Sequence, residues 1–219
     1  MPHLLHLDAS LDQQHSRSRS ITAAFSDTWE AQGDDFTVTY RDLHLDPVPH
    51  LRDPALHWPA RLRQAGSPTD PAEERIQQGL IEQLLSADVL LLGVPMYNYS
   101  LPSTLKAWID HIHVPGLTAP FDGDTQPMAG RPAVLVTARG GSYDEGSPTE
   151  GWDHTIPPLQ LILGTALGMR VHVIATSLTL ADSVPRMAEH LDRARAEAEK
   201  ARADAVDLAL TLSKEPRTS

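Results

Sequence analysis

The sequence predicts an α/β fold, a doubly wound five-stranded parallel sheet with helices on both faces. Strand-like and helix-like segments alternate over nearly the whole chain of 219 residues, as in folds that wind helices around a parallel sheet. Three mostly apolar runs, at 89–94, 133–137 and 171–175, predict buried strands, and the first is apolar on both faces, which is typical of parallel strands covered on both sides. No repeat, low-complexity block or linker divides the chain, so we expect a single domain over residues 1–219.

The first half of the chain contains two strands, one helix and a long loop. Residues 4–7 form a short apolar strand, and residues 36–43 alternate as a strand does, with Val38 and Tyr40 on one face. Between them, apolar or partly apolar residues recur at helical spacing: Ile21, Ala24, Phe25 and Thr28. Residues 44–71 are rich in Pro, His and Arg without a clear period, which predicts an ordered loop.

The second half predicts the remaining strands and helices. The three mostly apolar runs supply three buried strands. Apolar residues at steps of three and four predict helices over residues 72–86, 101–112 and 158–168. A stripe of Leu, Ala and Met from Met187 to Leu212 predicts a long amphipathic C-terminal helix.

Composition excludes several classes of protein. The chain has 18 Lys and Arg against 29 Asp and Glu, a net charge of −11, which argues against nonspecific nucleic-acid binding. The absence of cysteine excludes disulfides, thiolate metal sites and thiol nucleophiles, and it fits a reducing compartment. No stretch resembles a signal peptide or a membrane span. We therefore expect a cytoplasmic protein that does not bind the membrane.

Ligands of open α/β sheets bind at the carboxyl ends of the strands, and the loop at residues 8–20 lies at such an end. Its serines offer hydroxyl donors at Ser10, Ser16, Ser18 and Ser20. The start of the following helix adds unpaired N–H groups and the positive end of the helix dipole, so the loop suits a terminal phosphate. Arg17 and Arg19 could add positive charge. The alternative is that the serines only cap the helix.

Two further loops lie at strand ends, at 95–100 and 138–146. The first contains large side chains where small turn residues are usual, and Asn98 offers both a donor and an acceptor, which suits a planar heteroaromatic ring. The second combines two glycines with Tyr143, and glycines let backbone N–H groups approach a ligand closely. Each loop alone could be an ordinary turn.

The chain resembles the FMN-dependent NADH:quinone oxidoreductases, also called FMN-dependent azoreductases, of flavodoxin-like fold. The most specific match is the segment ADVLLLGVPMYNYSLPSTLKAWIDHI, and Ala138-Arg139-Gly140-Gly141 resembles the Ser-Arg-Gly-Gly flavin loop of the family. The resemblance implies that the FMN phosphate is held by Ser10, Ser16, Arg17 and Ser18. It implies that the flavin ring is held by Pro95, Met96, Tyr97, Asn98, Tyr99, Ala138, Arg139, Gly140 and Gly141.

The implied activity is two-electron reduction of quinones and reductive cleavage of azo bonds, with NADH or NADPH as the hydride donor. The flavin performs the chemistry, so no catalytic acid or base is assigned, and Tyr143 is a candidate substrate contact or a plain aromatic wall. Segment 116–132 is shorter than in the family, an aromatic residue is missing from 163–168, and Ala138 replaces the usual serine. Trp108 and its apolar helix suggest a homodimer.

Other functions compete with this one. A flavodoxin-like electron carrier or a general NAD(P)H:FMN reductase would share the fold and the cofactor. A serine hydrolase is disfavoured because no Gly-x-Ser-x-Gly motif is present. A metal site is disfavoured because the pairs His111/His113 and His3/His6 are not spaced as ligands.

Overall fold

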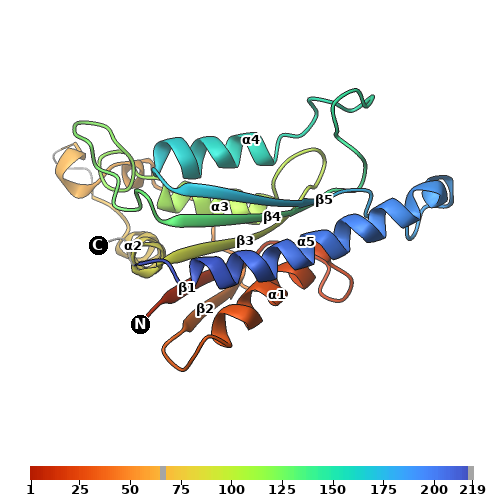
Figure 1. Ribbon diagram of the computed structural model, residues 1–219. Helices are drawn as coiled ribbons and strands as arrows, with labels where there is room; N and C mark the ends of the chain where they lie inside the picture. The colour runs from red at the N-terminus through yellow and green to blue at the C-terminus, as the bar shows by residue number, and fades with distance from the viewer. Residues whose placement is uncertain (65–67, 217–219) are drawn as a thin grey trace.

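The computed structural model describes residues 1–64 and 68–216 and contains one five-stranded parallel sheet in the order β2-β1-β3-β4-β5 (Figure 1). The strands are β1 His3–Asp8, β2 Thr37–Asp42, β3 Val89–Pro95, β4 Pro132–Ala138 and β5 Arg170–Thr176. The chain reverses its direction of travel across the sheet between β1 and β3, and ligands of such sheets bind at this switch point.

Helices cover both faces of the sheet, which confirms the predicted fold class (Figure 1). One face carries α1 Arg17–Glu30 and α5 Leu191–Leu212. The other carries α2 Pro71–Ser86, α3 Ser103–Ile112 and α4 Ile156–Leu159, which continues as the π-helical segment Gln160–Ala166. Because side chains alternate along a strand, Leu4 packs with α1 and α5 while Leu5 packs against the opposite layer.

The strands differ in how far their residues are buried. β3 and β4 are buried along their whole length, as their continuous apolar runs predict. β5 is an edge strand, and Arg170 and Val173 on it are exposed. The prediction that the run at 171–175 is fully buried is therefore wrong, because an edge strand has a neighbour on one side only and its outer part stays open to solvent.

The long loop between β2 and α2 is ordered, as predicted, outside residues 65–67, which are not among the described residues. It contains two short 3₁₀ segments, Pro54–His57 and Ala60–Leu62. Leu56 is fully buried, and Gln77 Nε2 donates a hydrogen bond of 2.8 Å to its carbonyl oxygen. These contacts attach the loop to the layer formed by α2 and α3.

The C-terminal stripe forms a helix that begins later than predicted. α5 starts at Leu191, and Met187 lies in the preceding 3₁₀ segment Pro185–His190. The residues of α5 that are buried are mostly small: Ala194, Ala201, Ala205, Ala209 and Leu212. Over residues 1–64 and 68–216, each helix is too short or too polar to cross a membrane.

Trp108 has no exposed surface, since α3 buries it against the sheet. The suggestion that Trp108 supplies a subunit contact is therefore wrong, because a side chain in the core cannot touch a second chain.

Candidate functional site

An open cleft of about 870 Å³ lies at the carboxyl end of the sheet. It combines the ends of the three predicted loops with a fourth segment, residues 179–183. The predicted residues that line it are Ser10, Ser16, Arg17, Pro95, Met96, Tyr97, Ala138 and Gly140. The sheet order places these loops side by side, because the carboxyl ends of parallel strands share one edge.

The serine loop joins β1 to α1 and ends in a helix cap. Ser16 is the N-cap, and its Oγ accepts the backbone N–H of Arg19 at 3.3 Å. Ser18 is fully buried with its Oγ 3.1 Å from Ser16 Oγ, so it supports Ser16 and does not line the cleft. The remaining N–H groups of the first helical turn have no acceptor within the helix, which leaves them for an anion.

The charged side chains around the serine loop leave no net positive charge. Arg17 forms an ion pair with Asp182 across the cleft. Asp12 also lines the cleft, and hydrogen bonds from the backbone N–H groups of His15 and Gln14 lower the pKa of its carboxyl. Arg19 turns beneath the loop toward Asp42, so the expectation that it adds charge to a bound phosphate is wrong. An anion would therefore be held mainly by hydroxyl and amide donors.

Tyr97 links the second loop to the serine loop. Its Oη accepts the backbone N–H of Leu11 at 3.0 Å and lies 3.3 Å from Ser10 Oγ. The phenol therefore fixes the serine loop from the cleft side, in addition to offering its ring as a wall.

Asn98 and Tyr99 form a tight two-residue turn and do not line the cleft. Tyr97 and Ser100 exchange two backbone hydrogen bonds of 2.9 and 3.0 Å around them. Both central residues have left-handed backbones, with φ of 49° and 68°, as the hairpin turn of type I′ requires. Asn tolerates this conformation, whereas Tyr adopts it at a cost. Tyr99 stacks edge-to-face on Trp152, with ring centroids 5.5 Å apart.

Only some residues of the third loop line the cleft. Ala138 and Gly140 line the cleft, whereas Arg139, Gly141 and Tyr143 do not. Arg139 instead donates to Asp153 Oδ2 at 3.1 Å and to Ser177 Oγ at 2.8 Å, so it joins the loop to its neighbours.

The guanidinium carbon of Arg139 lies over the ring of Tyr143, 5.7 Å from the ring centroid. Burial is the main factor that raises the pKa of the Tyr143 phenol. Its role as a substrate contact stays a prediction.

Sequence reasoning missed the fourth wall of the cleft, the segment after β5. Thr179, Leu180, Asp182 and Ser183 line the cleft, and Leu180 is 46% exposed. A Cβ on Gly140 would lie 2.9 Å from Leu180 Cδ1, so the glycine permits this segment to pack on the third loop. The segment follows the carboxyl end of a strand, which is the same signal that identified the other three.

The turn at Asn98 provides the first test of the site. Replacing Asn98 by glycine keeps the left-handed backbone and removes the amide. The family resemblance implies that this amide contacts FMN, so we expect FMN affinity to fall by up to about tenfold, the effect of losing one hydrogen bond. Asn98→Ala should show the same loss of affinity together with lower thermal stability, because alanine strains the turn. Flavin fluorescence titration and thermal unfolding measure the two effects. Unchanged FMN affinity in Asn98→Gly would mean that the amide makes no contact with the flavin.

Across residues 1–64 and 68–216, no group of three or more His, Asp or Glu is arranged to hold a metal ion. His111, from one of the two histidine pairs, lies with its Nε2 2.9 Å from the carbonyl oxygen of Pro49 in the loop before α2.

Comparison with known sequences gives consistent matches. The model of the flavodoxin-like fold family matches residues 2–202. An FMN-dependent NADH:quinone oxidoreductase of Kineococcus radiotolerans is 54% identical over 97% of this chain and 100% of its own length. A protein of the same name from Streptomyces coelicolor is 41% identical over 97% of this chain and 96% of its own length.

Solved structures share the fold at lower sequence identity. The azoreductase of Bacillus anthracis str. Sterne has a TM-score of 0.78 at 20% identity and covers 95% of this chain and 99% of its own. An FMN-dependent NADH-azoreductase of the Ames Ancestor strain, solved in complex with FMN, has a TM-score of 0.76 at 20% identity over 95% and 100% of the two chains.

Proposed function

We infer that this chain, which belongs to the FMN-dependent NADH:quinone oxidoreductases of the flavodoxin-like fold, reduces quinones in the cleft at the carboxyl end of its sheet. The observation that carries the proposal is the pairing of an anion-binding helix start at Ser16 with an apolar wall at Pro95, Met96 and Leu180 in one cleft. FMN has the same two parts, a terminal phosphate and a planar ring. We propose that the whole chain forms one domain around this cleft and works in the cytoplasm.

The residues of the cleft fit FMN. We propose that Ser10, Ser16, Arg17 and the first amides of α1 hold the phosphate, and that Ser18 supports Ser16 from behind. We propose that the ring lies against the loop of Pro95, Met96 and Tyr97 and the backbone of Ala138 and Gly140. We propose that Asn98, in the turn next to this loop and outside the cleft lining, reaches the polar edge of the bound ring. Bound FMN would supply hydride acceptance from NADH and two-electron reduction of the acceptor.

The protein's part in the reaction is to bind two flat molecules in turn. The cleft is one open space of about 870 Å³, and we propose that donor and acceptor compete for the same position in it. We propose a ping-pong cycle with quinones as the better acceptors, azo compounds as slower ones, and NADPH as a second donor. Azo cleavage needs two reductive rounds, whereas a quinone needs one.

Steady-state kinetics with NADH and menadione test this proposal. We expect turnover in the presence of FMN and parallel double-reciprocal plots. Intersecting plots would indicate a ternary complex and refute the shared position. Binding of FMN without turnover of menadione would favour the electron carrier over the enzyme. A slower rate with an azo dye than with menadione is expected under the same conditions.

We further propose that the protein is a homodimer. Three large apolar side chains are exposed on the cleft loops or on the π-helical segment after α4, which a second copy could cover: Tyr99, Trp152 and Leu161. Light scattering should give twice the mass of one chain at micromolar concentration, and the mass of a single chain would refute the proposal.

A further inference from the structure

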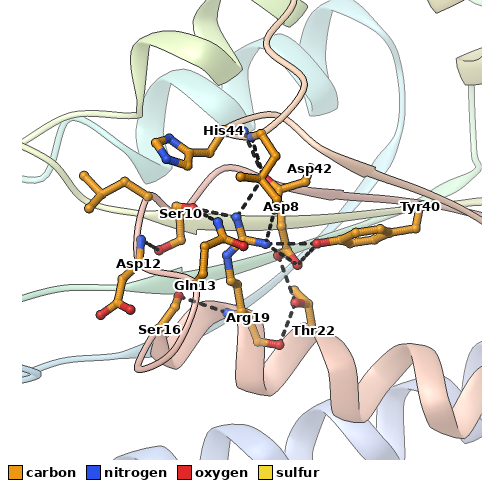
Figure 2. Close-up of polar contacts among 12 residues, drawn as sticks. Asp8, Ser10, Asp12, Gln13, Ser16, Arg19, Thr22, Tyr40, Asp42 and His44 are labelled. Atoms are coloured by element: carbon orange, nitrogen blue, oxygen red, sulfur yellow. Dashed lines mark hydrogen bonds and ion pairs between the residues drawn. The ribbon is translucent and has the colours of Figure 1, made fainter.

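Figure 2 shows a polar cluster next to the serine loop. Its central residues are largely buried and do not line the cleft. Its centre is Arg19, from the first turn of α1, between Asp8 at the end of β1 and Asp42 at the end of β2. The side chains of these three residues are 12%, 4% and 9% exposed, in that order. We call them, with Tyr40, the Arg19 clamp.

The guanidinium of Arg19 holds the serine loop and the end of β2 together. Its Nη2 donates to the carbonyl oxygen of Ser10 at 2.5 Å and to Asp42 Oδ1 at 2.9 Å. Its Nη1 lies 2.8 Å from Asp42 Oδ2 and donates to Tyr40 Oη at 2.9 Å. The fixed fork of a guanidinium suits this arrangement, because several acceptors in nearly one plane can be bonded at once.

Asp42 is itself fixed by the backbone. Its Oδ1 accepts the N–H groups of His44 at 2.9 Å and Leu45 at 3.1 Å. Burial opposes its charge, but the hydrogen bonds from Arg19, Leu45 and His44 prevail and lower the pKa of the carboxyl. Burial likewise opposes the charge of Arg19, yet its bond to Asp42 and the nearby carboxylates raise the pKa of the guanidinium. The pair is therefore ionised at neutral pH and rigidly placed.

The clamp determines which atoms of Ser10 face an anion. A carbonyl oxygen beside a phosphate repels it, and Arg19 holds the Ser10 carbonyl on the far side. The Ser10 hydroxyl then lies on the cleft side, where it accepts the N–H of Asp12 at 3.3 Å and lies 3.3 Å from Tyr97 Oη. Arg19 thus acts on the cleft only through the backbone of the loop.

We propose that Arg19 is a positioning residue that shapes the phosphate-binding loop from behind and thereby sets the preference of the cleft for a phosphorylated flavin. This rests on the proposed placement of the FMN phosphate at the serine loop. Because the clamp touches the loop and not the apolar wall, its loss should affect FMN and leave riboflavin, which lacks the phosphate, nearly unchanged.

The test compares FMN and riboflavin affinities by fluorescence titration. Arg19→Met is expected to weaken FMN binding about thirtyfold, as for the loss of charge-assisted hydrogen bonds, and riboflavin binding less than twofold. Arg19→Lys keeps the charge but not the fork, so an intermediate loss is expected. The matched control is Arg41→Met, which removes a neighbouring arginine paired with Asp46 at 2.8 Å and outside the clamp. It should change neither affinity.

Several results would overturn the inference. Equal losses for FMN and riboflavin in Arg19→Met, with a parallel fall in thermal stability, would show that Arg19 only supports the fold. An unchanged FMN affinity would show that the loop keeps its shape without the clamp. If Arg19→Met does not fold, the FMN and riboflavin affinities of Arg19→Lys test the inference in its place. Failure of the unmodified protein to prefer FMN over riboflavin would instead refute the placement of the phosphate.

Discussion

Replacing Ser16 by aspartate is expected to abolish FMN binding without weakening the fold. Ser16 caps α1, and aspartate caps helices as well as serine does, with a charge that favours the positive end of the helix. The same carboxylate would face the flavin phosphate. Two unit charges about 4 Å apart repel by about 4 kcal/mol at an effective dielectric constant near 20, which is close to a thousandfold in affinity. Fluorescence titration with FMN measures the loss, and thermal unfolding of the apoprotein measures the fold.

Ser16→Asn is the matched control, because asparagine also caps the helix and carries no charge. We expect it to lose no more than about tenfold in FMN affinity. Riboflavin should bind with the same affinity to the unmodified protein, to Ser16→Asp and to Ser16→Asn. Retention of FMN by Ser16→Asp would place the phosphate away from the start of α1.

Gly93→Ala, at the single glycine of the five strands, is expected to destabilise the protein strongly. Gly93 pairs with Asp8 across β1 and β3, and a Cβ there would lie 1.9 Å from Asp8 Oδ1 and 3.2 Å from Thr22 Cγ2. The carboxyl cannot yield freely, since Asp8 is buried and accepts a hydrogen bond of 3.0 Å from Thr22. We expect a loss of about 3 kcal/mol in the free energy of unfolding, the range of an overpacked core.

Chemical denaturation measures this loss, with Gly79→Ala as the control. Gly79 lies in α2, and a Cβ there would have no neighbouring atom within 4 Å, so alanine should stabilise the protein by about 0.5 to 1 kcal/mol. Introducing Gly93→Ala into an Asp8→Ala background should cost at least about 1 kcal/mol less than in the native chain, because the two positions are in contact. Additive effects of the two substitutions would contradict the clash.

The fold could be predicted from the sequence because a strand that is buried on both faces has apolar residues at consecutive positions. β3 and β4 read as continuous apolar runs, and only parallel strands between two helix layers need that composition. β5 reads almost the same, yet it lies at the edge. Strand order is a property of the assembled sheet, so an apolar run alone cannot show whether a second neighbour is present.

The site could be predicted only in outline. Strand ends and serines located the cleft, because the topology forces these loops together. The sequence could not predict toward which partner each side chain points. Arg19 was expected to add charge at the phosphate and Arg139 to hold the flavin ring, but in the structure both arginines join loops. Distant partners, Asp42 for Arg19 and Ser177 for Arg139, bind each guanidinium. Asp42, which completes the clamp, lies at the end of a strand with no local signal of its role.

The open edge of β5 has a consequence for the behaviour of concentrated solutions. Its outer backbone groups can pair with a strand of another molecule, and the edge presents Val173, which is 37% exposed. Arg170 at the start of the strand could act as a gatekeeper against such pairing, but its charge is already matched by Glu215. We therefore expect β5 to be one edge along which strand-to-strand aggregation can occur, and a lysine in place of Val173 would protect this edge without touching the cleft.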